Sequence, residues 1–123
     1  MPPEAPAPAT PDPAAAFVLQ RRMLRACRAA AGRLKMADSL GTKLTGRELL
    51  TRILVAKRVL DRVLGPDEKR VGVLLPPTAG GAIVNAALAL SGRVAVNLNY
   101  TSTQPILDIC IERLWERKLV LRD

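Results

Sequence analysis

The residues best placed to do chemistry follow two short apolar runs of the sequence. Residues 78–81 (Thr-Ala-Gly-Gly) stand between the run 71–75 and a helical pattern, and the free amides of such a helix start can bind a phosphate. This segment lacks GxGxxG, GxxxxGK[ST] and any lysine at the turn, so we favour glycines that allow close helix–sheet packing. Residues 97–101 (Asn-Leu-Asn-Tyr-Thr) form a polar cluster after the second run, where open α/β sheets collect ligands. Loop hydrogen bonding and helix capping are the simpler interpretation of that cluster.

The acidic residues and the cysteines supply no convincing catalytic set. Asp108, Glu112 and Glu116 line one face of a predicted helix, but interleaved basic residues indicate an exposed, salt-bridged face. The absence of histidine excludes Ser-His-Asp and Cys-His centres and histidine metal sites. Cys27 and Cys110 form no CxxC pair, and we expect both to be reduced, buried thiols. We therefore assign no catalytic, cofactor-binding or metal-binding residue.

Charge and composition limit the classes of partner. The 123-residue chain carries 19 basic and 11 acidic residues, a net charge of +8, and the basic excess lies in its N-terminal half. Only 2% of the residues are aromatic, which argues against base-stacking modules, so we expect no nucleic-acid partner. The longest apolar stretch, 71–91, is broken by Pro76-Pro77 and is too short on either side to span a bilayer. We expect a cytoplasmic protein, membrane-peripheral if its basic segment binds lipid.

The basic residues gather on an element that precedes the rest of the fold. Residues 1–13 hold six of the ten prolines, which predicts a disordered or polyproline II tail. Residues 14–36 predict a basic amphipathic helix. Three interpretations stay open: a surface helix leaning on the domain, a contact with an acidic protein or an anionic membrane, and an organelle transit peptide. The membrane contact would use Arg21, Arg22, Arg25 and Arg28.

Residues 37–123 predict one α/β domain. Glycine punctuation predicts a tight hairpin over residues 38–45, with Leu40 and Leu44 beside its turn. A capping-box spacing then opens a helix over 46–64, which Gly65-Pro66 ends. Continuous apolar runs predict buried strands, and they alternate with helical patterns.

The alternation after residue 70 predicts the sheet. The expected order is strand 71–75, helix 78–91, strand 94–98, helix 103–115 and strand 118–121. Such an order is typical of parallel strands joined by helical crossovers. We therefore expect a small, three-stranded, mostly parallel sheet with flanking helices.

Residues 37–113 resemble the opening part of AMP-forming acyl ligases in three motifs. Residues 37–50 (ADSLGTKLTGRELL) are similar to that family's hairpin, which leads through LTY-x-E-L into a helix. Residues 69–77 (KRVGVLLPP) are similar to its D-R-V-A-[IV]-L-L-P-N strand. Residues 88–101 (LALSGRVAVNLNYT) resemble its A-L-L-K-A-G-x-V-[AV]-V-P-L-N-P segment, in a form closest to acyl-acyl-carrier-protein and acyl-CoA synthetases. After Arg113 the family's next glycine is missing and the pattern departs.

The resemblance implies an ATP- and Mg²⁺-dependent enzyme that activates a fatty acid as an acyl-adenylate and transfers it to a carrier thiol. The family's phosphate loop with its lysine, its T-G-D motif and its C-terminal lid all lie downstream of the matched part. We therefore expect an N-terminal fragment that is inactive alone, with an acyl carrier protein or the remainder of the ligase as partner. The alternative function is a non-catalytic interaction module whose basic helix binds an acidic protein or an anionic membrane surface.

Overall fold

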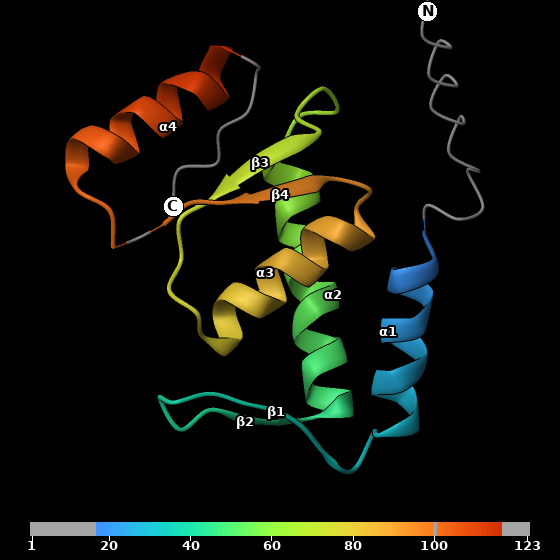
Figure 1. The fold of residues 1–123 in the computed structure, drawn as a ribbon. Helices are drawn as coiled ribbons and strands as arrows, with labels where there is room; N and C mark the ends of the chain where they lie inside the picture. The colour runs from blue at the N-terminus through green and yellow to red at the C-terminus, as the bar shows by residue number, and fades with distance from the viewer. Residues whose placement is uncertain (1–16, 100, 117–123) are drawn as a thin grey trace, which may run out of the picture.

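The structure is a computed structural model that describes residues 17–99 and 101–116, and this part of the chain is mixed α/β (Figure 1). The Pro-rich tail expected at 1–13 and the strand expected at 118–121 lie outside the described residues. The elements are α1 (Val18–Ala29), β1 (Leu34–Ala37), β2 (Lys43–Thr45), α2 (Gly46–Val63), β3 (Arg70–Val73), α3 (Ala79–Leu90), β4 (Val94–Asn97) and α4 (Gln104–Glu116).

The predicted hairpin is confirmed, and Asp38 organises its turn. One carboxylate oxygen of Asp38 accepts hydrogen bonds from the amides of Leu40 and Thr42, each at 3.0 Å. Gly41 has a φ of +88°, a left-handed conformation that glycine adopts without strain. β1 and β2 therefore pair antiparallel, and the hairpin leads directly into α2.

The start of α2 is also confirmed, down to its side chains. The hydroxyl of Thr45 accepts a hydrogen bond from the Glu48 amide at 3.3 Å, and the Glu48 carboxylate accepts one from the Thr45 amide at 3.5 Å. This capping box satisfies two amides that a helix start leaves without partners. The helix ends at Val63, one residue before the predicted end.

The first helix is shorter than predicted. We expected a helix over 14–36, but α1 ends at Ala29 and Leu34–Ala37 form β1. The Gly46 amide donates to the carbonyls of Ala30 and Arg33, at 3.0 and 3.1 Å. The carbonyls at the end of α1 thus bind the start of α2, and the chain leaves the helix there.

The predicted parallel pairing of the two apolar runs is confirmed. β3 and β4 pair in parallel, with Arg70 opposite Val94 and Val73 opposite Asn97, and α3 connects them. The three-stranded sheet is wrong for the described residues, where β3–β4 and β1–β2 are two separate two-stranded sheets. β3 also ends at Val73 rather than residue 75, and the Val73 carbonyl accepts a hydrogen bond from the Leu98 amide, just after the end of β4, at 2.8 Å.

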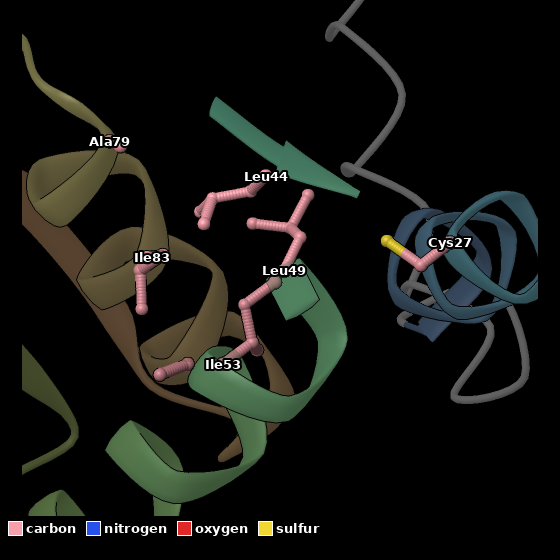
Figure 2. Packing of buried hydrophobic residues seen from close by; sticks show 7 residues of the cluster. Cys27, Leu44, Leu49, Ile53, Ala79 and Ile83 are labelled. Carbon is pink, nitrogen blue, oxygen red and sulfur yellow. The ribbon is translucent and has the colours of Figure 1, made fainter. Parts of the chain in front are cut away.

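The core forms two clusters around α2, which runs between α1 and α3 (Figure 1). The first cluster joins α1, the hairpin, α2 and α3, and Figure 2 shows Leu44, Leu49, Ile53 and Ile83 gathered at its centre. The second lies between the parallel sheet, α3 and the end of α2, and consists of Leu64, Val71, Val73 and Leu88. On α2, Leu49 and Ile53 are buried and Ala56 and Leu60 are half-buried, whereas Val63 is exposed.

Burial differs among the apolar side chains of α4 and between the two cysteines. On α4, Leu107 is buried, whereas Ile106 and Ile109 are exposed. A buried thiol is confirmed for Cys27, whereas Cys110 is only half-buried.

Candidate functional site

A cavity of about 560 Å³ opens at the carboxyl ends of β3 and β4. Its walls come from residues 36–38 of the hairpin, residues 75–79 before and at the start of α3, three residues of the first turns of α3, and Asn97 of β4. This is the edge of a parallel sheet where ligand sites are commonly found. Both polar segments singled out in the sequence, 78–81 and 97–101, contribute to it.

Among the described residues, Asp38 is the ionisable side chain in the wall of this cavity, and both its oxygens accept hydrogen bonds within the fold. One binds the turn amides described above, and the other accepts a hydrogen bond from the Ala79 amide at 3.0 Å. This bond lowers the pKa of Asp38 below its ordinary 3.8, while burial acts in the opposite direction. The carboxylate is therefore ionised at neutral pH and fixes the hairpin to the start of α3.

The position of Asp38 bears on the phosphate that residues 78–81 could bind. Its carboxylate accepts the hydrogen bond of the Ala79 amide and places a negative charge at the start of α3. A second anion there would be repelled, so the structure disfavours a phosphate site.

Of the two glycines, only Gly81 allows a close approach, and its neighbour is the segment before α3 rather than the expected sheet. A Cβ on Gly81 would lie 2.8 Å from the Pro76 carbonyl oxygen, so this close approach requires glycine. A Cβ on Gly80 would meet only the Thr78 hydroxyl, at an ordinary 3.6 Å, so packing does not explain Gly80.

The polar cluster 97–101 does not converge on one point. The side chain of Asn97 exchanges two hydrogen bonds with Asn85 of α3, at 2.9 and 3.0 Å. Asn99 instead accepts hydrogen bonds from the amide and hydroxyl of Thr101, at 3.0 and 2.6 Å. Tyr100 lies outside the described residues. Loop hydrogen bonding is therefore confirmed for Asn99, whereas Asn97 neither bonds within the loop nor caps a helix, and its pairing with Asn85 ties α3 to β4.

The cavity has the chemistry of a binding site rather than of a reaction centre. Its apolar wall includes Met36, Leu75 and two prolines, and its amide side chains bind each other. Asp38 accepts three backbone amide hydrogen bonds, and its lowered pKa makes it a weak general base at neutral pH. The arrangement suits a small, uncharged, largely apolar group. In the part of the chain that the structure describes, His, Cys, Asp and Glu form no group that could hold a metal ion.

The other charged candidates lie on exposed helix faces. Asp108 and Glu112 of α4 are exposed as expected, but the described side chains of α4 form none of the expected salt bridges, and Asp108 accepts a hydrogen bond from the Gln104 side chain at 2.8 Å. The side chain of Glu116 lies outside the described residues. Four exposed arginines on α1 form a second such face, which we call the α1 basic face: Arg21, Arg22, Arg25 and Arg28.

The signal for the central role of Asp38 was only partly present in the sequence. An aspartate at the start of a glycine-containing turn is typical of a side chain that binds nearby amides. Its bond to Ala79 spans 41 residues, and no local pattern indicates such a bond.

Within residues 17–99 and 101–116, no helix combines the length and apolarity needed to cross a membrane.

Comparison with known proteins adds no relative to this description. No protein-family model matches the chain, and no curated protein matches it.

Proposed function

We propose that residues 37–113 are the opening part of an AMP-forming acyl ligase and serve there as a scaffold. The observation that carries this proposal is the pairing of the two resembling strands. The motifs 69–77 and 88–101 supply β3 and β4, which pair in parallel across α3. The third motif, 37–50, supplies a hairpin that leads into a capped helix, in the order the resemblance implies.

In the complete enzyme, this segment would position reacting groups that come from elsewhere. ATP and Mg²⁺ would activate a fatty acid, and a carrier thiol, such as that of an acyl carrier protein, would accept it. Acyl-adenylate chemistry needs cationic groups at the phosphates. Among the described residues, no lysine or arginine lines the cavity at the carboxyl ends of β3 and β4, and Asp38 adds a negative charge. We therefore expect these residues alone to be inactive.

Two measurements test the ligase proposal. The first is fatty-acid-dependent ATP–pyrophosphate exchange by the purified 123-residue chain, for which we expect none. Exchange above the level without fatty acid would contradict the scaffold role. The second is translation of the DNA after codon 123 in all three frames, where we expect a Ser/Thr/Gly-rich loop ending in lysine. Its absence from every frame would contradict membership of a ligase.

The α1 basic face favours a second candidate function, a non-catalytic interaction module for an anionic partner. Residues 13–37 contain five arginines, one lysine and no acid. In the described residues the one salt bridge joins Lys57 to Asp61, on α2. Labelled polyglutamate tests this function: we expect binding at about 50 mM salt that weakens at about 300 mM, as screening requires. Binding neither to polyglutamate at the lower salt concentration nor to vesicles of anionic lipid would overturn it.

A further inference from the structure

We infer that α1 is a docking surface for an anionic lipid bilayer, with its arginines at the headgroups and its exposed apolar side chains inserted among them. This inference rests on the second candidate function, an interaction module, and names its partner.

The first support is the placement of charge. Arg21, Arg25 and Arg28 recur at spacings of four and three residues, so they share one face of α1, with Arg22 beside them. All four side chains are exposed. The next acid along the chain is Asp38, whose carboxylate is engaged by backbone amides. A bilayer with anionic headgroups complements such a face, and each arginine adds to the attraction.

The second support is that the opposite side of α1 is fixed to the protein. Cys27 and Ala30 are buried, and the side chain of Gln20 donates a hydrogen bond to the Ala89 carbonyl of α3 at 3.2 Å. The carbonyl of Ala30 also binds the Gly46 amide of α2. The α1 basic face is therefore presented outward by a packed helix and needs no change in fold to meet a surface.

The third support distinguishes a lipid surface from an acidic protein. Phe17, Val18 and Leu19 are 43%, 44% and 76% exposed at the N-terminal end of α1. Val18 lies three and four residues before Arg21 and Arg22, so apolar and basic side chains share one side of the helix. A purely electrostatic contact does not bury these exposed apolar side chains, whereas an interfacial helix binds through both its basic and its apolar side chains.

Co-sedimentation with vesicles tests the inference. The full chain is mixed with phosphatidylcholine vesicles, with or without about 30% phosphatidylserine. We expect binding only to the anionic vesicles, falling as salt rises. A triple variant, Arg21→Gln, Arg25→Gln and Arg28→Gln, should lower the partition coefficient about 100-fold.

The matched control for charge is a triple variant on α2: Arg52→Gln, Arg58→Gln and Arg62→Gln. These side chains are also exposed, and the net charge falls by the same amount. We expect the α2 variant to bind severalfold more weakly at most, and circular dichroism confirms that both variants fold. Equal losses in the two variants would overturn the inference, because α1 would then contribute no more to binding than another exposed basic helix face.

The matched pair for the apolar contribution is Leu19→Asn and Leu40→Asn. Both leucines are 76% exposed, and Leu40 lies in the hairpin turn. Leu19→Asn should weaken vesicle binding about fivefold, and Leu40→Asn should leave it unchanged.

The outcomes separate this inference from the functions proposed above. Binding to polyglutamate without binding to anionic vesicles would overturn the lipid surface and leave the interaction module standing. An unchanged partition coefficient for the α1 triple variant would also overturn it. The ligase proposal is decided separately, by exchange activity and by the DNA sequence.

Discussion

At Gly46, the start of α2 lies against the backbone at the end of α1. A Cβ there would lie 2.2 Å from the Cys27 carbonyl oxygen and 2.5 Å from that of Ala30. Both neighbours are backbone atoms, so no side chain can rotate away. Gly46→Ala should therefore lower the free energy of unfolding by about 3 kcal/mol, the upper end of the usual overpacking cost.

Urea unfolding measures this loss, and Gly32→Ala is its matched control. Gly32 has no neighbour within 4 Å of an added Cβ, so its substitution should change stability by less than about 1 kcal/mol. Equal effects of the two substitutions would show that the helices can separate to admit a methyl group.

Asp38 predicts a pH dependence of stability. Its pKa in the folded state is lowered from 3.8, chiefly by the Ala79 amide, so the folded protein favours the ionised form. The resulting stabilisation is fully present above the ordinary pKa and is lost as the pH falls through the lowered one. We expect Asp38→Asn to reduce stability at about pH 7 and to have a smaller effect near pH 2.

The measurement is the urea midpoint of both proteins across that range. Asp61, whose pKa is also lowered, mainly by Lys57, is present in both proteins and cancels in the difference. A difference that stays constant as the carboxylates protonate would contradict a role for the charge of Asp38.

At the scale of elements, sequence patterns correctly predicted the features that depend on contacts between residues close in the sequence. The hairpin, the capping box of Thr45 and Glu48, and the alternation of β3, α3 and β4 all depend on residues close in the sequence. The predicted end of α1 was wrong, because α1 ends where Ala30 contacts Gly46, a residue outside the local pattern of the helix. For the cavity, the sequence indicated only the edge of the sheet at which it lies. The bond of Asp38 to Ala79 could not be predicted, because it joins segments that are 41 residues apart.

The capping box supplies a prediction for α2. Thr45→Ala removes the oxygen that accepts the Glu48 amide, so we expect a loss of about 1 kcal/mol in thermal or urea unfolding. Thr51→Ala is the control, because the Thr51 hydroxyl donates to the Arg47 carbonyl within the same helix and caps no amide. An equal loss for Thr51→Ala would show that threonine content, rather than capping, affects α2.

At the scale of the molecule, α2 holds the two core clusters together. Leu60 packs against both, whereas Ile53 belongs to the cluster beside the hairpin and Val71 to the one beneath the parallel sheet. α3 also spans both clusters, through Ile83 and Leu88. Shared helices with packed side chains make separate unfolding of the two clusters unfavourable, so we expect one cooperative unit.

Ile53→Ala tests this cooperativity through a distant strand. Ile53 is 1% exposed, and its truncation should cost about 2–5 kcal/mol through lost contacts and an added cavity. If the clusters unfold together, hydrogen exchange of the β3 amides should accelerate to the same extent as exchange in α1 and β2, although Ile53 belongs to the other cluster. Faster exchange in α1 and β2 with unchanged protection of β3 would show instead that the parallel sheet is a separate unit.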